Sequence, residues 1–355
     1  MQNKTKMIIG GLAAGTVLAG ATAGVGALLV ARHIFKTVRG RRLRELRGQT
    51  VLITGGSRGL GLAMAEEFAR QGAKIAICAR DEQELTRARH CLEHLGVEVC
   101  AVTCDVAKPD QVEQMIRTVR RQLGAIDVLV NNAGIISVGP LLSQTLEDFQ
   151  RAMDVMFWGT VHPTLSALPE MLARGRGKIV NITSIGGKVS IPHLVPYSCA
   201  KFATVGFSEG LHAELKRFGV HVLTVVPGLM RTGSHLNAEF KGKHESEFGW
   251  FALSGTSPLA SVSARRAAQK IVHATCANRT ELVISWQAKL LADIHAIAPG
   301  LTQDALALVN RLLPDASGSA EKKLGRDSHS AVTRSPLTAL GRRAARRYNQ
   351  PEQIA

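Results

Sequence analysis

Short apolar runs of strand length alternate with segments of helical spacing from residue 49 onward, and this alternation is the feature that most limits the fold. The apolar runs are "TVLITG", "KIAICAR", "VEVCAVTCDV", "IDVLVNNAG", "GKIVNITS", "VHVLTVVPG" and "TELVIS". Strands that are apolar on both sides must be covered on both faces, and in α/β proteins the intervening helices provide that cover. The sequence therefore predicts a doubly wound α/β fold with a parallel sheet and helices on both faces.

A glycine-rich turn joins the first predicted strand to the first predicted helix. Glycines at such a turn allow a tight backbone, let N–H groups approach a pyrophosphate, and bring the anion-attracting helix N-terminus close to the sheet. A glycine-rich loop alone is a weak signal, but its position between a strand and a helix favours dinucleotide binding. The residues expected to contact the cofactor in this turn are Thr54, Gly55, Ser57, Arg58, Gly59 and Gly61.

The end of the second predicted strand indicates which nicotinamide cofactor is used. An acidic residue there would bond the ribose 2′-hydroxyl and repel a 2′-phosphate, but Ala79 takes that place and Arg80 follows it. Arg58 adds a second guanidinium, which suits bidentate contact with a phosphate. These residues favour NADP(H). If both arginines are only solvated, the choice of cofactor stays open.

The stretch "YSCAK" places Tyr197 four residues before Lys201. Residues four apart share one face of a helix, so the ammonium can lower the pKa of a phenol whose ordinary value, near 10, makes it a poor acid–base catalyst at neutral pH. By itself, Tyr-x-x-x-Lys is a common pair on helix surfaces. Behind a dinucleotide loop we interpret it as catalytic, with Tyr197 donating a proton to a carbonyl as hydride arrives and accepting one in the reverse direction.

The glycine turn has the spacing T-G-x-x-x-G-x-G, and with "NNAG", Ser184, "YSCAK" and "PGLMRT" it resembles the short-chain dehydrogenase/reductase family. The motifs occur in the family's order and at its spacings across residues 48–285. The resemblance implies a Rossmann-like domain that transfers a hydride between NADP(H) and a carbonyl or alcohol. It also implies a homo-oligomer, because relatives are often dimers or tetramers.

The resemblance assigns roles to individual residues. Ser184 would stabilise the carbonyl or alkoxide oxygen, Lys201 would also hold the nicotinamide ribose, and Thr232 would orient the nicotinamide amide. The other positions implied to contact the cofactor are Asp105 at the adenine, Asn132, Ala133 and Gly134 beside the sheet, Tyr197, and Pro227 with Gly228.

One position departs from the family pattern. In "DVMFWGT" the family usually has Asn where this chain has Met156, and that Asn helps to hold a water that links the lysine to solvent. A thioether cannot replace an amide in this task. The alternative to an enzyme is therefore a membrane-associated NADP-binding scaffold or sensor with little turnover. Nucleotide-sugar epimerisation fits poorly, because such relatives usually show T-G-x-x-G-x-x-G.

The N-terminal segment predicts a membrane anchor. Residues 7–31 contain no charged side chain, and 25 residues at about 1.5 Å each are long enough to cross a hydrocarbon core of about 30 Å. Seven basic residues follow between Arg32 and Arg47, so the positive-inside rule places the catalytic domain in the cytoplasm, with a single span. A cleaved signal peptide is the main alternative, although the uncharged run is long for one. The spacings in "GLAAG" and "GATAG" suit either a helix dimer or a weakly hydrophobic span.

Charge and cysteine content exclude two other classes of function. The formal net charge is +16, but residues 51–314 contribute only +4, with 27 basic residues against 23 acidic ones. The folded body therefore has no implied nucleic-acid face. The six cysteines lack the spacing of a disulfide framework or a metal site, and Cys100 and Cys104 are expected to be buried as small apolar side chains. We predict no metal.

The C-terminal third suggests the substrate class and the remaining domain boundaries. Aromatic residues gather between 240 and 251, where the family builds its substrate-covering loop, and either line a pocket or pack the loop onto the core. With a membrane anchor, an apolar loop favours a hydrophobic, lipid-like carbonyl or alcohol, and hence a role in lipid metabolism. We divide the chain into an anchor and basic segment (1–47), an NADP-binding catalytic domain (48–285), a helical extension (286–314) and a basic, mostly disordered tail (315–355).

Overall fold

The computed structural model describes residues 46–350, apart from 258–259, 316–319, 331–332 and 334. The predicted anchor at residues 7–31 lies outside the described residues. Across the part of the chain that the structure describes, no helix is both long enough and apolar enough to cross a bilayer.

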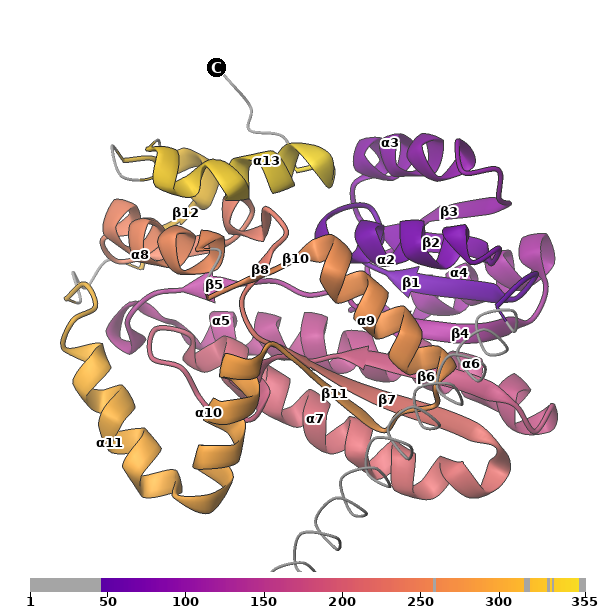
Figure 1. Ribbon diagram of the computed structural model, residues 1–355. Helices are drawn as coiled ribbons and strands as arrows, with labels where there is room; N and C mark the ends of the chain where they lie inside the picture. Colours follow the sequence, from indigo (N-terminus) through magenta and orange to yellow (C-terminus); the bar gives the residue numbers. More distant parts are fainter. Residues whose placement is uncertain (1–45, 258–259, 316–319, 331–332, 334, 351–355) are drawn as a thin grey trace, which may run out of the picture. The chain divides into compact units, whose positions relative to one another are not determined.

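A seven-stranded parallel sheet forms the centre of the fold (Figure 1). Its strand order is β11-β7-β6-β4-β1-β2-β3. The strands are β1 (Thr50–Thr54), β2 (Lys74–Ala79), β3 (Val99–Thr103), β4 (Ile126–Asn131), β6 (Gly177–Ile182), β7 (Val220–Pro227) and β11 (Glu281–Ile284). The order reverses between β1 and β4, and in open α/β sheets ligands bind beyond the carboxyl ends of the strands at such a switch point. The predicted fold class is confirmed.

Helices cover both faces of this sheet. On one face α2 (Gly59–Arg70) packs against α9 (Ala264–Cys276), and on the other lie α6 (Gly159–Ala173) and α7 (Val195–Leu215), of which α7 is seen below β7 in Figure 1. The helix α4 (Pro109–Leu123) packs against α6, and α3 (Glu82–Glu93) against α2.

One large part of the core lies between the sheet and α4. Val112, Met115, Ile116 and Val119 are spaced three or four apart, so they share one face of α4 and bury it. They meet inward side chains of the strands such as Leu129. At roughly 25 cal/mol per Å² of apolar surface, burial of this kind is the main stabilising contribution in the domain.

A second, smaller layer sits beyond the carboxyl ends of the strands, and we call it the cap. It comprises a three-stranded sheet with two helices, namely β5 (Ser137–Val138), β9 (Glu239–Lys241), β12 (Lys322–Leu324), α8 (His244–Thr256) and α13 (Ala339–Arg347). Phe240 and Phe248 are buried at its centre in edge-to-face contact, with Trp250 and Phe251 beside them. The aromatic residues of 240–251 therefore mainly pack the cap onto the domain, which was one of the two predicted roles.

The prediction that residues beyond 315 are mostly disordered is wrong for the described part of that segment. Lys322–Leu324 pairs with β9, and α13 packs on α8. Short helical turns, η6 (Gly325–Asp327) and η7 (Pro336–Thr338), connect them. The polar composition of the segment hid this order, because its small residues contribute by fitting closely: a Cβ on Gly341 would lie 2.2 Å from the Thr256 side chain.

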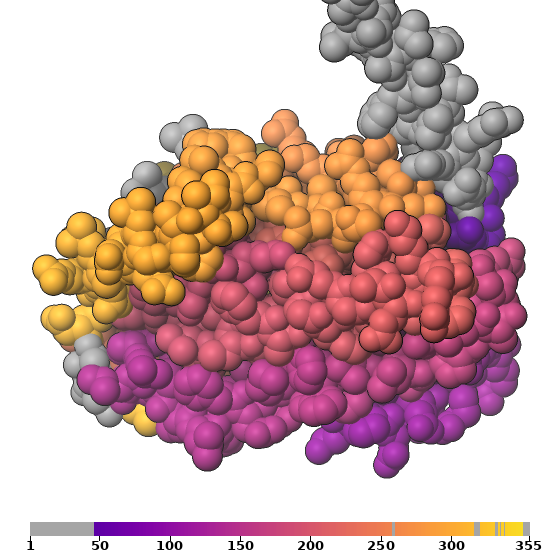
Figure 2. Space-filling model, turned by 90° about the horizontal axis from the view of Figure 1, so that it is seen from below, coloured from indigo at the N-terminus to yellow at the C-terminus, as the bar shows by residue number. Residues whose placement is uncertain are grey.

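The predicted helical extension consists of α10 (Trp286–Ile297) and α11 (Pro299–Asn310). They pack mainly on each other, and Figure 2 shows them in orange and yellow at one end of the face that α7 occupies. Their apolar side chains remain largely open to solvent, with Trp286 at 71% and Ile297 at 86% exposure.

Candidate active site

The glycine turn between β1 and α2 is shaped by close backbone contacts. Gly55 has φ +63°, a conformation that favours glycine, and a Cβ on Gly61 would lie 2.1 Å from the Gly55 carbonyl oxygen. A Cβ on Gly56 would lie 2.5 Å from the Ile77 side chain. These contacts hold the first turn of α2 close to the sheet at the switch point. A helix N-terminus in this position can bind the pyrophosphate of a dinucleotide through its N–H groups.

The "NNAG" segment is tied directly to this turn. The Thr54 hydroxyl accepts hydrogen bonds from the backbone N–H groups of Asn132 (2.9 Å) and Ala133 (3.1 Å). In return the Asn132 amide donates to the carbonyls of Thr54 (3.0 Å) and Gly55 (3.1 Å). The two strands at the switch point are thus locked together, and Gly134 continues beside the side chain of Met156. The structure brings these predicted cofactor residues to one edge.

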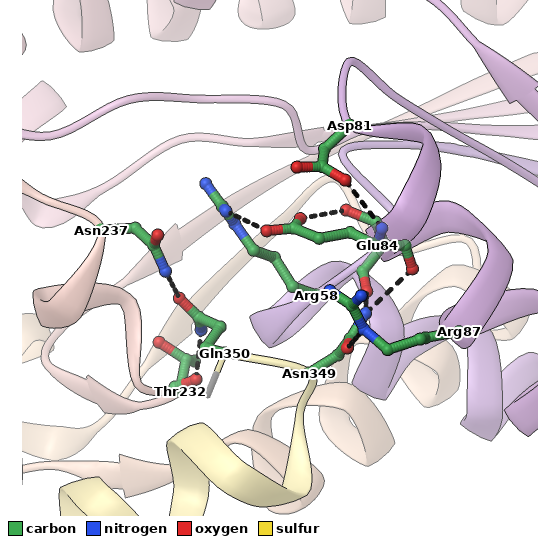
Figure 3. Close-up of polar contacts among 9 residues, drawn as sticks. Arg58, Asp81, Glu84, Arg87, Thr232, Asn237, Asn349 and Gln350 are labelled. Atoms are coloured by element: carbon green, nitrogen blue, oxygen red, sulfur yellow. Dashed lines mark hydrogen bonds and ion pairs between the residues drawn. The ribbon is translucent and has the colours of Figure 1, made fainter. Parts of the chain in front are cut away.

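The predicted phosphate-binding arginines lie in different surroundings. Arg58 is paired with Glu84 at 2.6 Å, and Glu84 also accepts from the Ser57 hydroxyl at 3.1 Å (Figure 3). Arg80 is exposed directly after β2. We did not foresee Glu84. Its signal was the capping sequence "DEQE", in which the Asp81 carboxylate accepts from the Glu84 N–H and so fixes the start of α3.

Asp105 follows β3, and its carboxylate accepts from the Ala107 N–H at 3.1 Å. Pro227 ends β7. A Cβ on Gly228 would lie 2.8 Å from the Ser285 hydroxyl, so the backbone passes close to the start of α10. Thr232 is buried and faces Gly59 across the site, because a Cβ on Gly59 would lie 3.8 Å from the Thr232 Cβ. All the predicted cofactor residues therefore border the carboxyl edge of the sheet.

Ser184, Tyr197 and Lys201 are assembled by the end of β6 and the start of α7. Ser184 begins the short helix η3 (Ile185–Gly187), where its hydroxyl accepts from the Gly186 N–H at 3.0 Å. The same hydroxyl and the Tyr197 ring both lie beside Gly186, where an added Cβ would be 3.5 Å from the hydroxyl oxygen and 3.2 Å from the ring. The Lys201 ammonium donates to the Ile182 carbonyl at 2.9 Å and lies 5.9 Å from the centre of the Tyr197 ring.

The electrostatics of this group differ from the prediction that Lys201 lowers the pKa of the phenol. Burial raises the pKa of Tyr197, and the nearby Ser184 hydroxyl opposes that rise only in part. Burial also lowers the pKa of Lys201 to about 8. In this conformation desolvation outweighs the attraction between the ammonium and a phenolate, and both groups are biased toward their neutral forms.

Met156 lies in a single stretch of π-helix, Met153–Trp158, between α5 (Leu146–Ala152) and α6. Its carbonyl accepts from the hydroxyls of Thr160 (2.8 Å) and Thr204 (3.2 Å), and its buried side chain packs on Tyr197. The two share a cavity of about 10 Å³, which is near the size of one water site. The side chain therefore fills space beside the phenol with an apolar group.

The remaining chemically suggestive side chains have structural contacts. His193 is buried and hydrogen-bonds the carboxylate of Glu247 at 2.9 Å, and His162 contacts the Val106 carbonyl at 3.1 Å. Cys100 and Cys104 are buried, as predicted. Within the described ranges, no group of three or more His, Cys, Asp or Glu side chains is arranged to hold a metal ion.

Comparison with known proteins defines the class that this fold and site represent. The model of the short chain dehydrogenase family matches residues 49–241. The chain belongs to this family, and it is an NAD(P)-dependent oxidoreductase that acts on CH–OH or carbonyl groups.

Among curated proteins, the chain is 38% identical over 203 residues to a dehydrogenase/reductase SDR family protein 7-like from Anopheles gambiae. This match covers 56% of the chain and 64% of the mosquito protein, so the chain spans less than two thirds of that relative. It is 31% identical over 277 residues to dehydrogenase/reductase SDR family member 7B from Bos taurus, covering 76% of the chain and 83% of that protein.

Two solved structures show the same fold with a nicotinamide cofactor. L-Sorbose reductase from Gluconobacter frateurii, complexed with NADPH and L-sorbose, is 28% identical with a TM-score of 0.61, covering 68% of this chain and 96% of that one. Actinorhodin polyketide ketoreductase with NADPH is 31% identical with a TM-score of 0.60, covering 66% and 95%.

Proposed function

We propose that the chain is a membrane-anchored, NADP(H)-dependent oxidoreductase for a hydrophobic, lipid-like carbonyl or alcohol. The observation that carries the catalytic part is that the Ser184 hydroxyl and the Tyr197 ring lie side by side at Gly186, with Lys201 one helical turn further along α7. These groups lie at the same sheet edge as the glycine turn.

The residues of the chain divide the chemistry between them. When bound, the nicotinamide supplies or accepts the hydride. Tyr197 is protonated at neutral pH, since burial raises the pKa of its phenol further above the ordinary value near 10, and it can donate that proton to a carbonyl oxygen. Ser184 orients that phenol and offers a second hydrogen bond to the same oxygen. Lys201, whose pKa burial lowers to about 8, holds the positive charge that favours the phenolate once the proton has left.

The preference for NADP(H) rests on charge at the end of β2. Ala79 leaves no carboxylate there to repel a 2′-phosphate, Arg80 is exposed directly after β2, and Arg58 lies in the glycine turn. Glu84 currently pairs with Arg58. A 2′-phosphate would have to take over that guanidinium, so we expect the gain from Arg58 to be partly offset by loss of the ion pair.

The hydrophobic substrate is supported by a cleft of about 560 Å³ beside the segment that leads into Tyr197. The cleft is lined by Leu141 and Leu142, by residues 190–193, and by α11 from Gln303 onward. Leu142 is 81% exposed and Ile297 86%, which is unusual for apolar side chains that serve only packing. Apolar side chains that stay open to solvent near such a cleft suit a substrate that comes from a bilayer.

The test is NADPH oxidation by the detergent-solubilised chain against long-chain and cyclic carbonyls, with small soluble carbonyls as a comparison. Tyr197→Phe should lower kcat by about 10²–10⁴-fold, because general acid catalysis contributes that much, and should leave NADPH binding intact. Cys199→Ala, an exposed position on the same helix, is the matched control. Reaction with small soluble carbonyls alone would contradict the lipid-like substrate.

Met156 favours a second candidate, a cofactor-binding scaffold or sensor with little turnover. The experiment that separates the two is Met156→Asn. If the wild type binds NADPH yet stays inert with every substrate in both directions, and Met156→Asn gains turnover, the apolar side chain beside Tyr197 is the reason and the scaffold becomes the better description.

A further inference from the structure

The end of the described chain lies directly on the glycine turn (Figure 3). The Tyr348 carbonyl accepts a hydrogen bond from the Gly59 N–H at 2.9 Å. The Asn349 amide donates to the Ser57 carbonyl at 2.8 Å, and the Gln350 amide donates to the Thr232 carbonyl at 2.5 Å. We call α13 together with Tyr348–Gln350 the C-terminal strap.

The local sequence explains how the strap reaches this position. Asn349 has φ +55°, in the left-handed region that Asn tolerates, and the Gln350 N–H returns to the Ala345 carbonyl at 2.8 Å. This is the closure of a Schellman motif, which ends a helix and reverses the chain sharply. The reversal turns Gln350 away from α13 and into the site.

Contacts along α13 hold the strap in register. Arg347 pairs with Glu66 of α2 at 2.9 Å. Ala345 packs so closely on Gly233 that a Cβ there would lie 2.5 Å from the Ala345 Cα. Gln350 is only 3% exposed, and its side-chain Oε1 accepts from the Asn237 side-chain amide at 2.9 Å. The strap is therefore specifically seated.

The strap occupies the position where the pyrophosphate of a dinucleotide would bind. Gly59 is the first residue of α2, and the N–H groups of a helix N-terminus are the donors that bind a pyrophosphate. Here that N–H is taken by Tyr348. The Gln350 amide lies 3.1 Å from where a Cβ on Gly59 would be and bonds Thr232 on the opposite side, so it bridges the two walls of the site.

We propose that the C-terminal strap is an autoinhibitory element whose last residues, Tyr348–Gln350, compete with the pyrophosphate of the nicotinamide nucleotide for the glycine turn. The strap offers a neutral carbonyl to Gly59, whereas a pyrophosphate offers full negative charge to a helix N-terminus that has no acidic residue in its first turn. The nucleotide therefore displaces the strap at sufficient concentration, and the strap raises the concentration that is needed.

The positions of these contacts predict that the strap does not discriminate between NADPH and NADH. Its contacts to Gly59, Ser57 and Thr232 meet the part common to both nicotinamide nucleotides, whereas Asn349 also donates to the Glu84 backbone carbonyl at 2.9 Å and accepts from Arg87 at 2.9 Å. The strap should weaken NADPH and NADH binding by a similar factor, whichever of them the enzyme prefers. This separates the proposal from the preference for NADP(H).

The test is direct titration of the full chain with NADPH and with NADH, followed by nucleotide fluorescence and calorimetry rather than by activity. Two variants open the strap: a chain that ends at Arg347, and Asn349→Ala with Gln350→Ala in the full-length chain. If the seated strap is about 90% populated, both variants bind roughly tenfold more tightly, since apparent affinity scales with the competent fraction. Arg346→Ala, an exposed position of α13, is the control and should stay within about twofold of wild type.

A peptide with the sequence of residues 339–350, added to the shortened chain, should restore weaker binding in competition with nucleotide. Hydrogen exchange provides a second readout. Saturating NADPH should speed exchange of the Gln350 backbone N–H, because its hydrogen bond to the Ala345 carbonyl forms only while the strap is bound to the glycine turn. Equal or weaker nucleotide binding by both variants, or slower exchange of the strap on binding, would overturn the proposal and make the strap part of the bound state.

Discussion

The nucleotide-binding half and the cap are held together by different physical means. In the half built from β1 to β3 with α2 to α4, the interior is mainly apolar, and side chains such as Ile53, Ile75 and Met115 are fully buried. The cap has an aromatic centre, and charged pairs join its strand β9 to α5 of the domain: Lys241 pairs with Asp148, and Arg151 with Glu239 at 2.6 Å.

This difference determines how each region tolerates change. An apolar interior accepts any side chain of similar size, and removing part of one costs about 1 to 5 kcal/mol according to the cavity left. A buried ion pair is sensitive to loss of either partner, because the remaining charge is left in a poor environment. The cap should therefore be the more fragile region toward single charge changes, and the nucleotide half toward changes of shape.

The largest expected effect is in the cap. Lys241→Met leaves the Asp148 carboxylate without its cation and should lower the free energy of unfolding by about 3–5 kcal/mol. Lys74→Met, which removes a mostly exposed pair with Glu98 in the nucleotide half, should cost less than about 1 kcal/mol. Urea denaturation of the two variants measures both. Equal losses of unfolding free energy in the two variants would show that the cap is no more sensitive to the loss of a charge than the nucleotide half.

The next effect is in the nucleotide half. Gly61→Ala places a methyl 2.1 Å from the Gly55 carbonyl oxygen, so the turn must move, at a cost of about 1–3 kcal/mol. Nucleotide binding should be lost as well, because the turn no longer presents its N–H groups. Thermal unfolding and an NADPH titration test both results. Unchanged binding would show that the turn is less constrained than its contacts indicate.

Acid should weaken the cap before the nucleotide half. Burial alone would raise the pKa of Asp148, but hydrogen bonds from Lys241 and Thr145 outweigh it and hold the pKa below the ordinary 3.8. A depressed carboxyl pKa stabilises the fold above 3.8, and this contribution is lost as pH falls through the lower, folded-state value. Stability measured from pH 6 to pH 2 should therefore fall less steeply for Asp148→Asn than for wild type. If stability falls equally steeply with pH in both proteins, Asp148 does not cause the loss of stability in acid.

The smallest expected effect is a gain in stability rather than a loss. Gly249 lies within α8 of the cap and has open space around its Cβ position, so Gly249→Ala should stabilise the protein by about 0.5–1 kcal/mol through helix propensity. Gly61 also lies within a helix, so the pair isolates packing from propensity. Destabilisation at Gly249 would show that the cap is packed as tightly as the nucleotide half.

Much of the catalytic domain was predictable from local patterns. The strand and helix alternation predicted the sheet, and the spacing of Tyr197 and Lys201 placed both on one helix. The direction of the phenol pKa was not predictable, because it depends on how much water the folded site excludes. The order of the segment after residue 315 was also missed, since its small and basic residues resemble a disordered tail until Gly233 and Thr256 are there to receive them.

By itself, the sequence determined the parallel α/β architecture, the glycine turn and the family pattern of Ser184, Tyr197 and Lys201, because periodicity and short motifs act through neighbours along the chain. Only the tertiary structure decided which charges meet in the cap, that Glu84 holds Arg58, and that Gln350 reaches Thr232 across 118 residues of sequence. Such contacts depend on the three-dimensional closeness of distant segments, and no local pattern encodes the partner of a single polar side chain.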